Sequence, residues 1–272
     1  MEHYLGIDIG SISTKLVVMD SVGTVTTSAY LATQGAPVAA VRDGLKQVTL
    51  LTPGADIAAV AITGSGRELV STVLKESLIK NEITAQAAAA AFYKPDAMTV
   101  IEIGGQDSKI IILRDGLVTD FGMNTICAAG TGSFLDHQAV RLGLSLEDFG
   151  RLALESRNPA RITGRCTVFA ESDMIHEQQT GVSLADIVYG LCKTLVRNYL
   201  TSVAAGKEIL TPVVFQGGVA RNPGMVRAFE EELGFKPEIP TNPELTGAVG
   251  AALLARREVE EISSRLSGIS KQ

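Results

Sequence analysis

Two segments of the chain place an acidic residue, a glycine turn and a lysine at the same spacing. The first reads Asp8-Ile9-Gly10-Ser11-Ile12-Ser13-Thr14-Lys15, and the second reads Glu102-Ile103-Gly104-Gly105-Gln106-Asp107-Ser108-Lys109. Glycine lets backbone N–H groups approach a phosphate chain closely, while hydroxyl groups add donors and lysine adds positive charge. Neither segment is a G-x-x-x-x-G-K-[ST] loop or a G-x-G-x-x-G dinucleotide turn. The pair therefore predicts phosphate binding of another type.

A third glycine turn follows an apolar strand that we expect over 213–218. It reads Gln216-Gly217-Gly218-Val219-Ala220-Arg221-Asn222 and precedes a helix that Pro223 can start. Any one such turn is as readily explained by a plain hairpin or the start of a helix. Three turns at the ends of expected strands are harder to explain in that way together.

The chain has three cysteines, of which Cys127 is expected directly before a helix and Cys166 at the start of another. Cys127 and Cys166 would meet the partial positive charge of a helix N-terminus, which favours the thiolate that metals bind. From position alone, burial as small hydrophobic residues is a slightly better explanation for both. Cys192 lies in an apolar stripe at helical spacing, so we expect it in the core.

The elements that position these residues alternate between strands and helices. We expect strands over 3–10, 14–20, 24–32, 57–64 and 213–218, and helices over 38–50, 66–76, 82–94, 133–143, 146–155 and 183–205, with others starting near Cys166, Pro223 and Glu244. Asp8 aligns with Glu102, Gly10 with Gly104 and Lys15 with Lys109 without a gap, which indicates an internal duplication. The pattern predicts an α/β fold in two similar halves with a ligand cleft between them.

Composition limits the range of partners and compartments. The chain has 272 residues, 46% of them hydrophobic, and a net charge of −6. That charge argues against a nucleic acid or an anionic membrane as the main partner. We find no apolar run long enough to span a bilayer and no signal peptide, and few cysteines suit a reducing compartment. We therefore expect a cytoplasmic protein.

The three glycine turns resemble, in order and spacing, those of the superfamily that contains acetate and sugar kinases, heat-shock chaperones and actin. The resemblance implies a duplicated actin-like fold, with residues 1–96 as the first lobe and 97–272 as the second. The last helix is expected to pack back on the first lobe, and a nucleotide cleft is expected between the lobes. The residues implied around ATP or ADP are Gly10, Ser11, Ser13, Thr14, Lys15, Gly104, Gly105, Gln106, Asp107, Gly130, Gly132, Gly217, Gly218, Val219, Asn222 and Gly247.

The same resemblance implies the catalytic residues. Asp8 and Asp107 would hold Mg²⁺, largely through water, because this ion keeps much of its hydration shell. Glu102 or Gln106 would orient the attacking water, and Asp8 completes the implied catalytic set. Glu102 departs from the superfamily, in which aspartate is usual, so the water-positioning role stays open between it and Gln106. Positioning and charge neutralisation would supply most of the catalysis.

The stretches NTICAAGTGSFLD at 124–136 and CTVFAESDMIH at 166–176 are more specific. They closely resemble the ATP-dependent activators of 2-hydroxyacyl-CoA dehydratases and the related ATPase subunits of benzoyl-CoA reductases, and the resemblance covers nearly the whole chain. It implies that Cys127 and Cys166 bind one 4Fe–4S cluster shared across a homodimer. Four thiolates hold such a cluster, so two from each subunit suffice.

The resemblance implies an ATPase coupled to electron transfer. The acceptor would be a separate iron–sulfur enzyme, such as a dehydratase or a related reductase, and ferredoxin or flavodoxin would be the donor. A small-molecule kinase acting on an amino sugar is one alternative, but it would need a substrate pocket with its own catalytic carboxylate. A nucleotide-sensing protein that does not hydrolyse ATP is the other.

Overall fold

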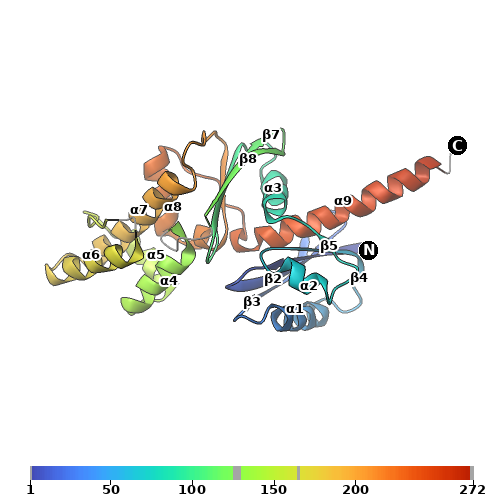
Figure 1. Cartoon of the computed structure of the whole chain (residues 1–272), viewed down its shortest axis with the longest axis horizontal. Helices are drawn as coiled ribbons and strands as arrows, with labels where there is room; N and C mark the ends of the chain where they lie inside the picture. The colour runs from blue at the N-terminus through green and yellow to red at the C-terminus, as the bar shows by residue number, and fades with distance from the viewer. Residues whose placement is uncertain (1, 125–129, 164–165, 270–272) are drawn as a thin grey trace. The chain divides into compact units, whose positions relative to one another are not determined.

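The computed structural model describes residues 2–124, 130–163 and 166–269, which form two compact units. The first unit contains Met1–Pro95 and Leu245–Gln272, and the second contains Asp96–Glu244. Each unit is built on one mixed β-sheet with helices packed on it (Figure 1). Among the helices in the described part of the chain, none combines the length and the apolarity needed to cross a membrane.

The sheet of the first unit has the strand order β3-β2-β1-β4-β5. Its strands are β1 (Glu2–Ile9), β2 (Ser13–Asp20), β3 (Val25–Ala32), β4 (Asp56–Thr63) and β5 (Leu78–Ile79), and its helices are α1 (Pro37–Leu51), α2 (Arg67–Ser71), α3 (Glu82–Tyr93) and α9 (Thr246–Ile269). Strand β1 pairs antiparallel with β2 and parallel with β4. Alternate side chains therefore face two apolar layers, one containing α1 and the other containing α3 and α9.

Helix α9 packs against its neighbours at backbone distance. A Cβ atom on Gly6 of β1 would lie 1.9 Å from the carbonyl oxygen of Ala248, and one on Gly250 would lie 1.8 Å from that of Ala85 in α3. Only glycine allows such an approach. The start of α9 is thereby held against the middle of the sheet.

The sheet of the second unit has the strand order β8-β7-β6-β9. Its strands are β6 (Thr99–Ile103), β7 (Ser108–Arg114), β8 (Leu117–Asn124) and β9 (Val213–Gln216), and its helices are α4 (Gly132–Arg141), α5 (Leu146–Ala153), α6 (Thr167–Gln179), α7 (Leu184–Ser202) and α8 (Pro223–Leu233), with short 3-10 turns at η2 (Gly218–Arg221) and η3 (Pro243–Leu245). One large apolar core contains Ile101 and Ile103 of the sheet together with residues of all five helices.

The two sheets repeat one design. Strands β1, β2, β3 and β4 of the first unit have the same order and directions as β6, β7, β8 and β9 of the second. Asp8 lies opposite Lys15, and Glu102 lies opposite Lys109 in the same type of antiparallel pair. The duplication expected from the sequence is therefore present in the register of the strands.

One expected helix is shorter than the sequence predicts. The pattern over 66–76 indicated a single helix, but α2 ends at Ser71. The hydroxyl groups of Ser71 and Thr72 donate to the carbonyl oxygens of Glu68 and Leu69, each at 2.7 Å. Such local bonds compete with helix propagation, and Thr72 and Val73 are also β-branched.

Candidate active site

Asp8 lies near the end of β1 in a cradle lined by glycine. Its Oδ2 accepts from the Nζ of Lys15 at 3.2 Å, and the two side chains are 14% and 15% exposed. A Cβ atom on Gly64 would lie 2.6 Å from Oδ1, and one on Gly247 would lie 2.7 Å from Oδ2. Any side chain at either glycine would displace the carboxylate. A carboxylate suits a hydrated Mg²⁺, because this ion keeps several waters that a carboxylate can accept hydrogen bonds from.

The turn between β1 and β2 is fixed by side-chain hydroxyls. Thr33 donates from Oγ1 to the carbonyl oxygen of Gly10 at 2.7 Å, and its hydroxyl also lies 2.9 Å from that of Thr14. Thr14 is fully buried, so its hydroxyl supports the turn. Ser13 is also buried, whereas Ser11 is exposed at the tip of the turn and has its hydroxyl accessible to a ligand.

The equivalent turn of the second unit contains a buried ion cluster. The Nζ of Lys109 lies 2.9 Å from Oε2 of Glu102 and 2.9 Å from Oδ1 of Asp107. Lys109 is 3% exposed and Glu102 5%, whereas Asp107 is 28% exposed. Two carboxylates share one lysine, so the cluster keeps one net negative charge, and Asp107 is its accessible member. Gln106 beside it is exposed.

Two further segments meet this second turn. The N–H of Gly132, at the start of α4, donates to the carbonyl oxygen of Gly104 at 2.8 Å, and that of Ser133 donates to Gly105 at the same distance. A Cβ atom on Gly217 would lie 2.8 Å from Oε1 of Glu102. The structure thus gathers residues predicted from three separate motifs, namely Glu102, Gly104, Gly105, Gln106, Asp107, Gly130, Gly132, Gly217 and Val219.

Two residues of the third turn differ from each other in their surroundings. Asn222 is the N-cap of α8, where its Oδ1 accepts from the N–H of Met225 at 3.2 Å, so this oxygen stabilises the helix. Gly218 has nothing within 4 Å of a Cβ atom built on it. Of the two, Gly218 is the one whose surface is open to a ligand.

The sequence reasoning missed a fourth turn, Gly64-Ser65-Gly66, after β4. Gly64 has a φ of +89°, and its counterpart Gly217 after β9 has a φ of +88°. Each glycine lies against the acid of the neighbouring strand, Asp8 or Glu102. The N–H of Gly66 donates to the carbonyl oxygen of Ile9 at 2.9 Å. The sequence feature that could have identified this turn is Gly-Ser-Gly directly after a strand, since Gly217 likewise follows a strand directly.

Cys166 is the N-cap residue of α6 and is partly exposed. Val168 and Phe169, in the first turn of the helix, are 64% and 65% exposed. A thiol at the start of a helix suits a metal ligand. Exposed apolar side chains beside it suit a site that a second protein surface covers. Cys127 lies outside the described residues, and within those residues no three His, Cys, Asp or Glu side chains form a metal-binding group.

Cys192 is a core residue, as predicted. Its side chain is fully buried in α7, and a Cβ atom on Gly224 of α8 would lie 3.2 Å from its Sγ. Burial raises the pKa of the thiol to about 12. Such a thiol stays protonated at neutral pH and is a poor metal ligand.

The segment that leads to Cys166 is anchored on α7. Asp186 accepts from the hydroxyl of Ser156 at 2.7 Å and from the backbone N–H groups of Arg157 at 2.9 Å and Asn158 at 2.8 Å. Hydrogen bonds from Ser183 and then from Ser156 lower the pKa of this carboxyl to about 2. In its charged form, Asp186 therefore holds the first residues of this segment in place.

Asp186→Asn is expected to lower the melting temperature at neutral pH and to remove part of the acid sensitivity. The pKa is depressed in the folded state, so the charged form stabilises the fold above an unfolded value of about 4. That stabilisation is lost as the pH falls from about 4 toward the folded value of about 2. When melting temperatures are measured between pH 2 and 7, the difference between the variant and the parent protein should shrink as the pH falls. Glu147→Gln, at an exposed residue of α5, is the control, and a constant difference at every pH would contradict this assignment.

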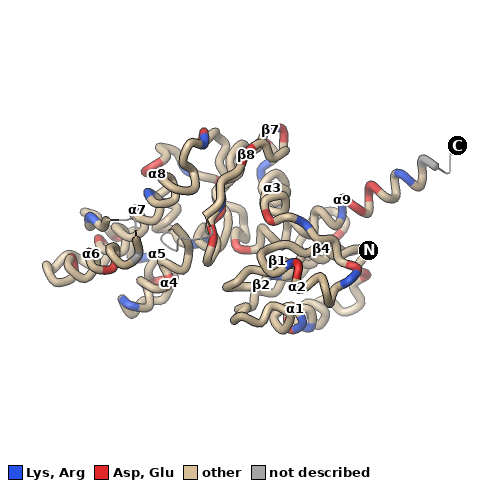
Figure 2. The backbone as a smooth tube through the Cα atoms, in the orientation of Figure 1, with Lys and Arg blue, Asp and Glu red and all other residues tan. Residues whose placement is uncertain are grey.

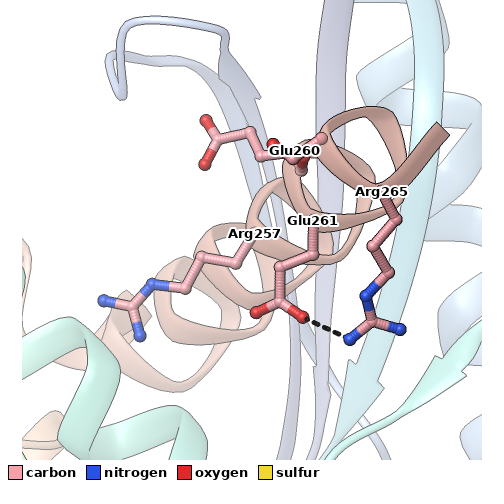
Figure 3. A pocket seen from close by; sticks show the side chains of 5 residues that line it. Arg257, Glu260, Glu261 and Arg265 are labelled. Atoms are coloured by element: carbon pink, nitrogen blue, oxygen red, sulfur yellow. Dashed lines mark hydrogen bonds and ion pairs between the residues drawn. The ribbon is translucent and has the colours of Figure 1, made fainter. Parts of the chain in front are cut away.

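A pocket lies on the exposed half of α9, lined by Arg257, Glu260, Glu261, Ser264 and Arg265 (Figure 3). Arg265 pairs with Glu261 at 3.6 Å, and this part of the helix carries both acidic and basic residues (Figures 2 and 3). Ten residues of helix, or about 15 Å, separate Arg257 from Gly247. The pocket is therefore not part of the glycine-turn site.

The chain is similar to known proteins over nearly its full length. The chain is 35% identical over 262 residues to the (R)-2-hydroxyglutaryl-CoA dehydratase activating ATPase of Acidaminococcus fermentans, covering 94% of this chain and 98% of the relative. It superimposes with a TM-score of 0.90 on the activator of the 2-hydroxyisocaproyl-CoA dehydratase from Clostridium difficile with bound ADPNP, at 34% identity and 97% coverage of each chain.

A more distant match confirms the predicted fold class. A ROK family glucokinase from Streptomyces griseus matches with a TM-score of 0.59 at 15% identity, covering 94% of this chain and 99% of that chain, so the two share a fold. The model of the BadF/BadG/BcrA/BcrD ATPase family matches residues 5–255. The protein is thus an ATP-hydrolysing enzyme with the duplicated actin-like α/β fold, and it belongs to the BadF/BadG/BcrA/BcrD ATPase family.

Proposed function

We propose that this ATPase is an electron donor that activates a partner iron–sulfur enzyme, such as a 2-hydroxyacyl-CoA dehydratase or a related double-cluster reductase. The observation that carries the proposal is the joint presence of two acid–glycine–lysine turns and an accessible cysteine at a helix start. Relatives across nearly the full length are named as dehydratase activators.

The cysteines argue for a homodimer. Cys127 and Cys166 of one chain offer two thiolates, and one 4Fe–4S cluster takes four. A second copy supplies the other pair and at the same time covers the exposed Val168 and Phe169. The bound cluster supplies a one-electron reductant, and ferredoxin or flavodoxin is the upstream donor. The role of the chain is to hold the cluster at the start of α6, where a partner can approach it.

The glycine turns supply the nucleotide chemistry. Asp8 in the first unit and Asp107 in the second each offer a carboxylate that suits a hydrated Mg²⁺, and such an ion would supply positive charge to the phosphates. Lys109 engages Glu102 at 2.9 Å in a nearly inaccessible pair, so Glu102 is a poor candidate for orienting water. Gln106 is exposed beside it. We therefore assign the orientation of the attacking water to the carboxamide of Gln106.

The protein reconstituted without oxygen is expected to be a brown dimer with about four iron atoms per two chains. It should hydrolyse ATP and reduce a clostridial-type dehydratase only when ATP is present. Iron analysis, size-exclusion chromatography and a reduction assay with ATP or a non-hydrolysable analogue test each step. A colourless monomer without iron after reconstitution would falsify the proposal, even if ATP hydrolysis persisted.

A further inference from the structure

Thr63 is the last residue of β4 and the register partner of Asp8 in the parallel pair of β1 and β4. Paired residues on adjacent strands place their side chains on the same face of the sheet. The threonine side chain therefore lies on the same face of the sheet as the side chain of Asp8. Its residue is 1% exposed, so bulk water does not reach it.

The hydroxyl of Thr63 makes no hydrogen bond within the described part of the chain. The buried hydroxyls of Thr14 and Thr33 in the neighbouring turn, by contrast, contact each other, with their Oγ1 atoms 2.9 Å apart. A buried polar group without a partner destabilises a fold, and native proteins keep few of them. Valine has nearly the same shape and would avoid that cost, which indicates that the hydroxyl serves a ligand.

The surroundings of Thr63 indicate which ligand. The backbones of Gly64 and Gly247 pack against Asp8, because a Cβ atom at either would lie less than 3 Å from the carboxylate. A carboxylate and a hydroxyl on one face can both accept hydrogen bonds from the waters of a hydrated divalent cation, and Mg²⁺ keeps several waters in protein sites. Among the ion pairs in the described part of the first unit, Asp8 pairs with one cation, Lys15. Lys15 lies on β2, which flanks β1 on the side away from β4.

We infer that Thr63 is a positioning residue for this ATPase, with its hydroxyl accepting a hydrogen bond from a water of the divalent cation that accompanies the nucleotide. This inference rests on the proposed role of Asp8 as the acid that holds that cation. A hydroxyl that contacts a water of the cation affects the binding of the metal and does not contact the nucleotide itself. The hydroxyl then contributes to binding only when the metal is present.

The test measures the dissociation constants of ADP with and without Mg²⁺ by calorimetry on the whole protein. Thr63→Val is expected to weaken Mg²⁺-ADP binding by about fivefold and to change metal-free ADP binding by less than about twofold. Thr63→Ser keeps the hydroxyl and should restore the metal effect. Without ligand, Thr63→Val should melt about 2–4 °C higher than the parent protein, because it removes an unsatisfied hydroxyl.

Asp8→Asn distinguishes this inference from the assignment on which it rests. It is expected to abolish most of the gain in ADP affinity that Mg²⁺ provides. If Asp8→Asn leaves that gain intact, the metal assignment of Asp8 fails and the role of Thr63 fails with it. If Asp8→Asn removes the gain but Thr63→Val does not, only the role of Thr63 is overturned. Equal weakening with and without Mg²⁺ in Thr63→Val also overturns it, since the hydroxyl would then contact phosphate.

Discussion

Replacing Cys166 with alanine is expected to abolish iron binding while leaving ADP affinity within about twofold of the parent protein. Cys166 is the N-cap of α6 but makes no side-chain capping bond, so alanine removes the thiol with little cost to the helix. A cluster that loses one thiolate from each subunit keeps only two of its four protein ligands. Iron content and ADP binding, measured on the same anaerobic preparation, check both halves of the expectation.

Cys192→Ala is the matched control for this experiment. Its thiol is fully buried and has a pKa raised to about 12, so it should bind no metal. The control variant should keep its iron and lose only some stability, about 1 kcal/mol, from the small cavity. Iron at the parental level in Cys166→Ala, or loss of iron in Cys192→Ala alone, would contradict the assignment of the cluster ligand.

The sequence predicted the pairing of acid with lysine in both sheets because the motif repeats. Acid, glycine and lysine recur at the same offsets, and in both sheets this places acid opposite lysine in an antiparallel pair. The length of α2 was not predictable from apolar spacing alone, because hydroxyl bonds at Ser71 and Thr72 end the helix. Local side-chain competition of this kind leaves no periodic signal.

Contacts between distant segments were the harder part to predict. The approach of Gly247 to Asp8 joins residues separated by more than half of the chain. The shared use of Lys109 by Glu102 and Asp107 depends on side-chain geometry within one turn. Spacing identified these residues as candidates but did not say that Asn222 caps a helix or that Thr14 supports a turn. The prediction for Cys127 stays untested, because it lies outside the described residues.

The adjacent residues Gly217 and Gly218 separate the stability of the site from its binding of nucleotide. Gly217 has a φ of +88° and a ψ of 168°, and a Cβ atom there would lie 2.4 Å from the carbonyl oxygen of Ile103. Gly217→Ala therefore combines backbone strain with a steric clash and is expected to cost about 3 kcal/mol or more. It also displaces Glu102 from Lys109, so ATP hydrolysis should fall at least about tenfold.

Gly218→Ala should give the opposite pattern. Nothing lies within 4 Å of the position that the new methyl group would take, so the melting temperature should match that of the parent protein within about 1–2 °C. If the adenosine lies over this turn, the methyl group occupies its surface, and ADP affinity should fall about tenfold. Calorimetry and thermal melting of both variants check the two expectations together. Unchanged ADP affinity in Gly218→Ala would move the adenosine away from this turn, because a methyl group on an open surface can weaken binding only by meeting the ligand.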